Sequence, residues 1–265
     1  MSNEQRLKKA ASNKELKNTY DTVWKNDGFA SFFTFSGFTQ FKSILDMHNW
    51  EGLEVLEIGS GQGELGAMMI FAGAKKVDAV DFSEEATHIA RESLNLPGLN
   101  FICDDYKNLK GSYDVVVMDG VLEHFDNPFP ELRYITENFV KKDGYCITLS
   151  PSFLNPRGYV WMTLQLLFDV PMSLSDLHFL CPFDFEDFCK EHGYTLEYES
   201  ADQDWGCGKR TIIDFKKRIK NALSDAGMYQ EEKVDRFLKW LSRAVEYENF
   251  TEFSGANVTY KIGKG

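Results

Sequence analysis

Between residues 53 and 150 the chain alternates short apolar runs with amphipathic stretches. The run VVVM at 115–118 is apolar at every position, which is typical of a parallel strand buried on both faces. Amphipathic segments at 63–72, 83–94 and 129–140 fit helices between the apolar runs. Alternation of strand and helix predicts βαβ units around a parallel sheet. The predicted strands are 54–58, 76–80, 99–103, 113–118 and 144–149.

After residue 150 the pattern becomes more helical. An apolar helix is expected at about 158–169, and the stretch FDFEDFCKEHGY is typical of a helix that ends at Gly193. Two further strands are expected at 195–200 and 256–262. The connection between them is too long for a plain turn, so it should carry structure of its own. Its apolar positions predict amphipathic helices at 211–223 and 230–248.

The N-terminal part falls into two stretches. Residues 1–18 are polar and predict a frayed or helical lead-in, whereas 19–50 are rich in aromatic side chains. Phe38, Phe41 and Ile44 have helical spacing, so one helix is expected there. Tyr20 and Trp24 could close over a ligand bound elsewhere on the chain. Simple packing into a hydrophobic core is the other interpretation of these aromatic residues.

Charge and cysteine usage narrow the class of protein. A formal net charge of −12 disfavours a nucleic-acid partner, because phosphate binding needs a basic surface. No apolar run approaches the ~20 residues that span a bilayer, and the first residues lack the apolar core of a signal peptide. Five cysteines without a C-x-x-C pair indicate reduced thiols and a cytoplasmic location. Cysteines and histidines at 178–192 fit no zinc template, so no metal is expected.

The sharpest motif is VLEIGSGQGELG at 55–66. A strand is expected to end at Ile58, and the glycines at 59, 61 and 63 form a turn in which a ligand can approach the backbone. A helix should begin near Glu64, with free N–H groups at its first turn.

This segment resembles the class I S-adenosylmethionine (SAM)-dependent methyltransferase family, whose first motif is acid-x-Gly-x-Gly-x-Gly after a strand. Glu57, Gly59, Gly61 and Gly63 match that motif in place. The resemblance implies that the methionine part of SAM lies against the loop, including Ser60. It also implies that Glu57 holds the SAM amino group, directly or through water.

A dinucleotide site is the alternative for the same loop. Gly61, Gly63 and Gly66 satisfy G-x-G-x-x-G, the fingerprint of NAD-binding folds. The first glycine of a dinucleotide fingerprint is expected directly after the strand, at Gly59, whereas this match begins two residues later, at Gly61. It also leaves Glu57 unexplained and would place this carboxylate near a pyrophosphate. SAM is therefore the favoured cofactor.

Acidic residues follow the second and third predicted strands. Asp81 lies about 20 residues after the glycine loop, where an acid can bind two ribose hydroxyls. Ser83 is the better cap for the next helix, and Phe82 resembles the family's residue beside the adenine. Asp104 or Asp105 resembles the acid that bonds the adenine amino group, and Tyr106 follows as a further cofactor contact. Plain turn or loop acids are the alternative for each.

Asp119 and Gly120 follow the fourth strand as further candidate contacts of the cofactor, and the sequence VLEHF comes next. Leu-Glu-His at this place resembles the subgroup that contains ubiquinone-biosynthesis O-methyltransferases and many sugar, lipid and natural-product methyltransferases. His124 is the first candidate for a general base, and His178 is the second. A packing or Glu-paired histidine is the alternative for His124. Arg157, Lys209 and Arg210 occupy predicted loops and could hold an anionic acceptor, with solvated charges as the default.

The resemblance implies an α/β fold, with a Rossmann-like, mostly parallel sheet of seven strands and an antiparallel last strand. Residues 1–50 would form an N-terminal helical and aromatic cap. Residues 51–201 and 256–265 would form the SAM-binding core. Residues 202–255 would be a helical insertion between the sixth and seventh strands that forms part of the acceptor pocket.

The predicted activity is transfer of a methyl group from SAM to a hydroxyl of a small molecule, with S-adenosylhomocysteine as product. An amine is the second choice of acceptor group. The alternatives are a NAD-dependent oxidoreductase, a protein methyltransferase and a non-catalytic SAM-binding module. No NPPY- or DPPY-type tetrad follows the fourth strand, which disfavours adenine or glutamine as acceptor. The acceptor's identity and the oligomeric state stay open.

Overall fold

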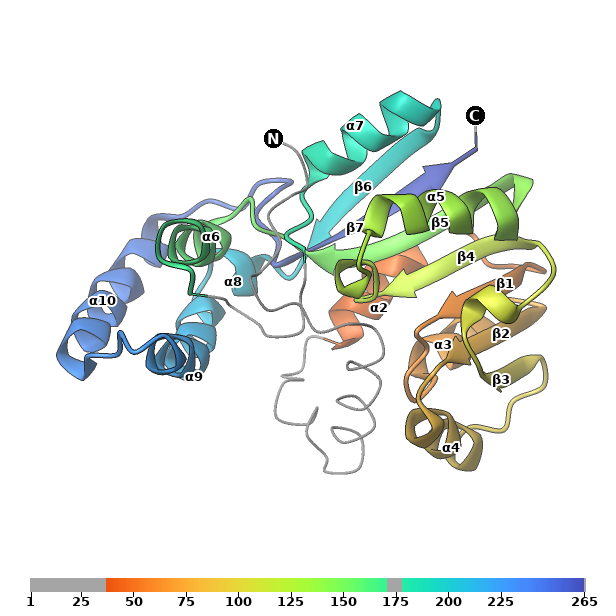
Figure 1. The fold of residues 1–265 in the computed structure, drawn as a ribbon, viewed down its shortest axis with the longest axis horizontal. Helices are drawn as coiled ribbons and strands as arrows, with labels where there is room; N and C mark the ends of the chain where they lie inside the picture. Colours follow the sequence, from red (N-terminus) through yellow and green to blue (C-terminus); the bar gives the residue numbers. More distant parts are fainter. Residues whose placement is uncertain (1–36, 171–177, 265) are drawn as a thin grey trace.

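The computed structural model describes residues 37–170 and 178–264 (Figure 1). Its seven-stranded sheet has the order β3-β2-β1-β4-β5-β7-β6. Strands β1 to β5 are parallel, and β7 runs antiparallel to β5 and β6. The predicted mostly parallel sheet with an antiparallel last strand is therefore confirmed. The strands are β1 (Glu54–Ile58), β2 (Lys76–Asp81), β3 (Leu99–Cys103), β4 (Tyr113–Asp119), β5 (Val140–Pro151), β6 (Thr195–Ala201) and β7 (Asn257–Gly263).

Two hydrophobic cores hold the two faces of the sheet. Helices α2 (Gly37–Asp46) and α3 (Glu64–Phe71) pack on one face, where Ile44 and Met69 are fully buried. Helix α4 (Glu84–Ser93) packs on β2 and β3. Helices α5 (Pro128–Phe139) and α7 (Pro182–His192) cover the other face, with Leu132 and Phe185 at its centre. Burial of both faces explains why the central strands are apolar at nearly every position.

Residue choice at the helix ends agrees with the sequence prediction. Ser83 caps α4 by accepting a hydrogen bond from the Ala86 amide at 3.2 Å. Gly193 ends α7 with φ of 71°, a conformation that favours glycine. One strand starts earlier than predicted: β5 begins at Val140, which pairs with Tyr113 across a register irregularity. That pairing depends on a partner strand, so the apolar pattern of 144–149 alone did not reveal it.

A separate group of helices forms a third core, which we call the helical module. It contains α6 (Pro156–Phe168), which follows β5, and α8 (Gln203–Gly206), α9 (Arg210–Asp225), α10 (Glu231–Ala244) and the short η4 (Val245–Tyr247), which lie between β6 and β7. Trp161 of α6 packs on Phe215 of α9 with ring centroids 5.3 Å apart. Figure 1 shows the module beyond the carboxyl ends of β4 and β5, and not on a face of the sheet.

A buried ion pair ties α6 to the insertion. Arg157 Nε lies 2.9 Å from Asp214 Oδ2, and both side chains are about nine-tenths buried. The expectation that Arg157 sits in a loop is therefore wrong, because it lies in the first turn of α6 and faces inward. Arg210 begins α9 and lies 3.4 Å from Asp204. No helix in the described part of the chain is long and apolar enough to cross a bilayer.

Candidate functional site

The glycine loop follows a backbone path that other residues would resist. Gly59, Gly61 and Gly63 have φ of 73°, 53° and 84°, all in the left-handed region. A Cβ on Gly59 would lie 2.4 Å from Val121 Cγ2, and a Cβ on Gly63 would lie 2.3 Å from the Phe101 ring. The loop therefore packs tightly against the segment after β4 and against β3. Ser60 is buried within it.

Glu57, next to the last residue of β1, is 3% exposed. Its Oε2 atom has no hydrogen-bond partner among the described residues. Burial raises the pKa of Glu57 well above its ordinary value, and the nearby carboxylates of Asp119, Glu64 and Asp81 raise it further. A Cβ on Gly66 would lie 2.7 Å from Oε2, so glycine at that position makes room for the carboxylate. A buried polar atom without a partner is costly, and a cationic ligand group would satisfy it.

Asp81, at the end of β2, holds the glycine loop in place. Its carboxylate accepts hydrogen bonds from the backbone amides of Gly61 at 2.9 Å and Ser83 at 2.8 Å. A carboxylate has about four acceptor positions, so these two bonds are compatible with ribose binding. Phe82 is 40% exposed beside it. Asp81 therefore has the turn role that the sequence offered as its alternative, and its role toward a ligand stays a prediction.

The acids after β3 are exposed and take part in local turns. Asp105 caps the short helix η2 (Tyr106–Asn108) by accepting a hydrogen bond from the Lys107 amide at 2.9 Å. Asp104 accepts from the Asp105 amide and from Asn108 Nδ2, each at 2.7 Å. Both carboxylates keep further acceptor positions.

Tyr106 lies in the core beneath this turn. Its hydroxyl donates a hydrogen bond to Glu131 of α5, and its ring packs near Phe125 and Phe139. Burial is the first cause that raises the pKa of Tyr106, followed by the bond to Glu131. The structure thus gives Tyr106 a packing role, and its contact with a cofactor stays a prediction.

Two more acidic residues, Asp119 and Glu123, lie with Glu57 at the carboxyl ends of the central strands. Burial raises the pKa of Asp119 to about 7, and the neighbouring Glu123 adds to this effect. Glu123 belongs to η3 (Leu122–His124), is buried, and accepts a hydrogen bond from Ser150 of β5 at 3.1 Å. Gly120, between them, has φ of 64°. We call Glu57, Asp119 and Glu123 the acidic group.

The two candidate histidines lie on the same side of the site. His124 ends η3 and is partly buried. His178 is buried, and its Nε2 lies 3.3 Å from the carbonyl oxygen of Asp126, in the loop that follows His124. A contact with a carbonyl requires a proton on Nε2, so that nitrogen is not the better base. His124 therefore stays the first candidate. Tyr20 and Trp24 lie outside the described residues.

Sequence reasoning missed two contributions to this site. Gly66 was weighed only as part of a dinucleotide fingerprint, whereas it gives space to Glu57. Ser150 was not considered, although a hydroxyl near the end of an otherwise apolar strand was a usable signal. Both contacts join elements that are separate in sequence.

Comparison with known proteins identifies the domain. Residues 55–144 match the family model described as "Methyltransferase domain". The chain is 29% identical over 153 residues to a ubiquinone biosynthesis O-methyltransferase of Neisseria meningitidis, covering 54% of this chain and 63% of that protein. It is 30% identical to a ribosomal protein L11 methyltransferase of Ruminiclostridium cellulolyticum over 42% of this chain and 36% of that protein. The chain thus spans less than two thirds of either relative, and the acceptors named for them differ.

The fold has solved counterparts. A chain from the complex between the Haloferax volcanii Trm112 methyltransferase activator and the putative methyltransferase superposes with a TM-score of 0.61. That match covers 93% of this chain and 95% of that one, at 16% identity, so it concerns the fold alone. The strand order, the glycine loop after β1 and the match over 55–144 agree with one another. Residues 55–144 carry a methyltransferase domain, and the chain is similar in sequence and in fold to class I SAM-dependent methyltransferases.

Proposed function

We propose that this protein transfers a methyl group from SAM to a hydroxyl of a small molecule, with an amine as the second choice of acceptor group. The observation that carries the proposal is the buried carboxylate of Glu57, whose Oε2 atom has no hydrogen-bond partner among the described residues, beside a loop of three left-handed glycines. Charge complementarity supports SAM, because SAM carries a sulfonium and an ammonium group. An anionic pyrophosphate would meet the acidic group, which disfavours NAD.

Each chemical group of SAM has candidate contact residues in this site. Glu57 would hold the amino group, and the glycine loop with Ser60 would lie against the methionine part. Asp81 would bind the ribose hydroxyls from its place at the end of β2, beside the glycine loop. Phe82 and the acids at 104–105 would lie along the adenine. When bound, SAM supplies a methyl group already activated on sulfur.

The protein's own contribution is positioning and proton removal. A fixed site that aligns the acceptor with the methyl group lowers the entropic part of the barrier. An alcohol or phenol acceptor must also lose its proton, and a neutral histidine can take it. We assign this role to His124, which lies next to the acidic group, with His178 as the second candidate.

A small-molecule acceptor fits the Leu-Glu-His segment after β4 better than the alternatives. The relatives' printed names include both a small-molecule pathway and a ribosomal protein, so a protein acceptor is the second hypothesis. We further propose that the helical module forms one wall of the acceptor pocket, because α6 and α8 follow directly from the carboxyl ends of β5 and β6. All five cysteines are free thiols, which supports our proposal of a cytoplasmic location.

The proposal is tested by incubating the protein with methyl-labelled SAM and a panel of phenols, sugars and amines. Label should pass to a hydroxyl compound. His124→Ala should then lower turnover by about a hundredfold while leaving SAM affinity nearly unchanged, because a base acts in the chemical step. His88→Ala is the matched control, since His88 is exposed on α4. Turnover of His124→Ala within a factor of about two of wild type would remove His124 from the mechanism.

A further inference from the structure

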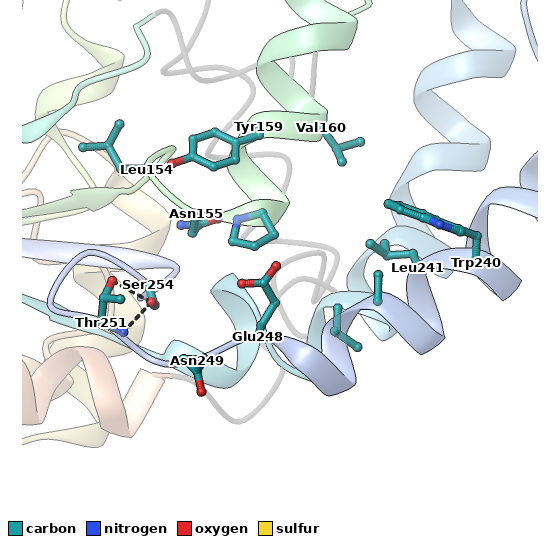
Figure 2. A pocket seen from close by; sticks show the side chains of 13 residues that line it. Leu154, Asn155, Tyr159, Val160, Trp240, Leu241, Glu248, Asn249, Thr251 and Ser254 are labelled. Atoms are coloured by element: carbon teal, nitrogen blue, oxygen red, sulfur yellow. Dashed lines mark hydrogen bonds between the residues drawn. The ribbon is translucent and has the colours of Figure 1, made fainter.

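The helical module contains a cavity of about 400 Å³ between the start of α6 and the end of α10 (Figure 2). Leu154 and Val160 line it on one side, and Leu241, Ala244 and Val245 line it on the other. The volume falls within the range of pockets that hold small molecules. These walls are mostly apolar, so the few polar groups that reach the cavity decide what it can recognise.

Three polar side chains in the wall are bonded to the protein itself. Asn155 donates hydrogen bonds to the carbonyl oxygens of Ser152 and Gly255, and its amide oxygen accepts from the Gly158 amide at 2.7 Å. Thr251 and Ser254 bond to each other at 2.9 Å between their hydroxyl oxygens. These groups shape the wall and have little capacity left for a ligand.

Glu248 differs from the rest of the wall. Among the described residues that line the cavity, Glu248 is the one acidic side chain, and none of them is Lys, Arg or His. Its side chain extends toward the start of α6, and no described cation pairs with it (Figure 2). Asn249, by contrast, points away from the cavity.

Two aromatic side chains at the cavity are unusually exposed. Trp240 is 64% exposed and Tyr159 is 58% exposed, although both line the cavity. Large exposed aromatic rings beside an apolar hollow are typical of binding surfaces. The faces of aromatic rings attract cations, most strongly tryptophan. A carboxylate and two rings at one apolar cavity therefore share a preference for a positively charged group with an apolar body.

We propose that this cavity binds small amphiphilic cations, in which an ammonium group faces Glu248 while an apolar body fills the space between α6 and α10, with the rings of Tyr159 and Trp240 at its two sides. The absence of basic residues from its described lining excludes phosphorylated and carboxylated ligands as its preferred class. The site is independent of the proposed methyl transfer, because its test requires neither SAM nor turnover.

The test uses three probes on the full chain, followed by calorimetry or ligand-observed NMR. Benzyltrimethylammonium is the cation, benzyl alcohol the neutral compound and 3-phenylpropionate the anion. The cation should bind most tightly and the anion should not bind. Glu248→Gln should weaken cation binding about threefold or more, and Trp240→Ala should weaken it similarly. Neither change should alter the affinity for SAM, which separates this site from the cofactor site.

Glu246→Gln is the matched control, because Glu246 is exposed on η4 and does not line the cavity. It should leave cation binding unchanged. Thermal unfolding of each variant checks that the module stays folded. Equal binding of the cation and benzyl alcohol, insensitivity to Glu248→Gln, or no binding of the cation at millimolar concentration would each overturn the proposal.

Discussion

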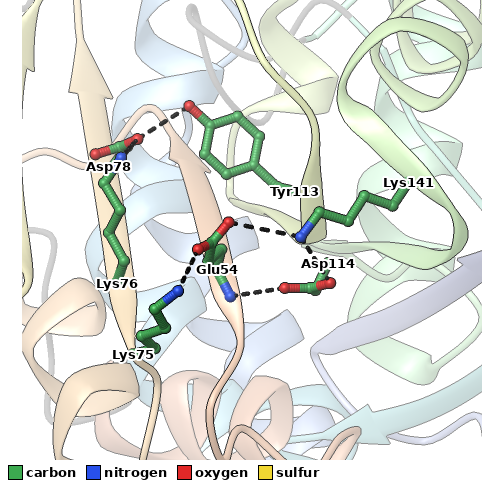
Figure 3. A network of polar contacts seen from close by, with 7 residues as sticks. All are labelled: Glu54, Lys75, Lys76, Asp78, Tyr113, Asp114 and Lys141. Carbon is green, nitrogen blue, oxygen red and sulfur yellow. Dashed lines mark hydrogen bonds and ion pairs between the residues drawn. The ribbon is translucent and has the colours of Figure 1, made fainter.

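Acidic side chains stand at both ends of the parallel strands, and their surroundings differ. At the amino end, Glu54 lies 2.7 Å from Lys75 Nζ and 3.6 Å from Lys141 Nζ (Figure 3). Asp114 lies 3.0 Å from Lys141 and accepts the Glu54 amide at 2.8 Å. The Lys75 hydrogen bond lowers the pKa of Glu54. Burial acts to raise the pKa of Asp114, but the Glu54 amide and Lys141 bring it below its ordinary value.

Asp78 belongs to the same network, nearer the middle of β2. It lies 2.6 Å from Lys76 Nζ, and it accepts from Asn100 at 2.9 Å and from the Tyr113 hydroxyl at 3.0 Å. Burial raises the pKa of Tyr113 to about 12, and the charge of Asp78 adds to the effect. Each acid at this end thus has a cation or a hydrogen-bond donor within reach.

At the carboxyl end of the strands, the pKa values of two acidic side chains are raised and not lowered. Burial raises the pKa values of Glu57 and Asp119, and neighbouring acids raise them further. In the described part of the chain, no cation is among the groups that act on these two carboxyls. Such an arrangement destabilises the charged form and persists where a ligand supplies the missing partner. The difference indicates that the amino end serves the fold, whereas the carboxyl end is shaped for a cationic ligand.

The largest effect is expected from breaking the backbone at the carboxyl end. Gly63→Ala places a Cβ 2.3 Å from the Phe101 ring in a left-handed conformation. We expect loss of SAM binding and a clear drop in Tm. Gly52→Ala is the control, because Gly52 has φ of 75° but no atom within 4 Å of its added Cβ. It should cost about 1 kcal/mol and leave SAM binding intact. Calorimetry and thermal unfolding distinguish the two variants.

Asp81→Ala should come second. It removes a carboxylate proposed to bind ribose and also releases the amides of Gly61 and Ser83. SAM affinity should fall about tenfold or more, roughly 1.4 kcal/mol. Asp114→Ala at the opposite end should lower stability without changing SAM affinity. An unchanged dissociation constant in Asp81→Ala would show that Asp81 serves the turn alone.

Glu57→Gln tests whether the buried acid is kept for a ligand. The change should weaken SAM binding about fivefold, roughly 1 kcal/mol. It should also raise Tm at pH 8, because it removes a buried acid that has no cation beside it among the described residues. Glu54→Gln should do the reverse, with SAM affinity unchanged and Tm slightly lower. A drop in Tm for Glu57→Gln with unchanged SAM affinity would contradict the comparison.

The smallest expected effect is the dependence of SAM affinity on pH. Because the folded pKa of Asp119 is about 7, its carboxyl loses a proton as pH rises from 6 to 8. The charged form attracts a cation, so SAM affinity should increase over that interval, and Asp119→Asn should flatten the profile. Calorimetry at pH 6, 7 and 8 gives the comparison. A wild-type affinity that falls with rising pH would contradict it.

The same shift has a defined sign for stability. A carboxyl whose folded pKa lies above its unfolded pKa contributes stability that is present below the unfolded value and is lost as pH rises through about 7. Asp119→Asn should therefore stabilise the protein relative to wild type at pH 8 and have little effect at pH 5. For Glu54 and Asp114, with lowered pKa values, stability is present at neutral pH and lost on acidification.

Much of the fold could be predicted from the sequence because local pattern determines it. The apolar runs located all seven strands, and Ser83 and Gly193 marked helix ends in agreement with the structure. The glycine loop was predictable because spacing and backbone freedom are local properties. What failed depends on distant partners. The Arg157 side chain faces inward because it pairs with Asp214, which lies 57 residues later in the chain.

The sequence pattern also did not predict which helices belong to the helical module. The amphipathic helices after β6 were predicted, but the pattern of 158–169 gave no sign that α6 shares their core. A segment's own periodicity shows that one face is buried, and not what buries it. A boundary drawn at residue 202 therefore separates Trp161 from Phe215, its partner in the module.

The most direct test of the central claim is calorimetric titration of the full chain with SAM and, separately, with NAD. The carboxyl end should bind SAM, because the acidic group of Glu57, Asp119 and Glu123 favours a cation, and Glu57→Gln should weaken that binding. NAD should not bind, since its pyrophosphate would meet the same carboxylates. Binding of NAD without binding of SAM would contradict the account.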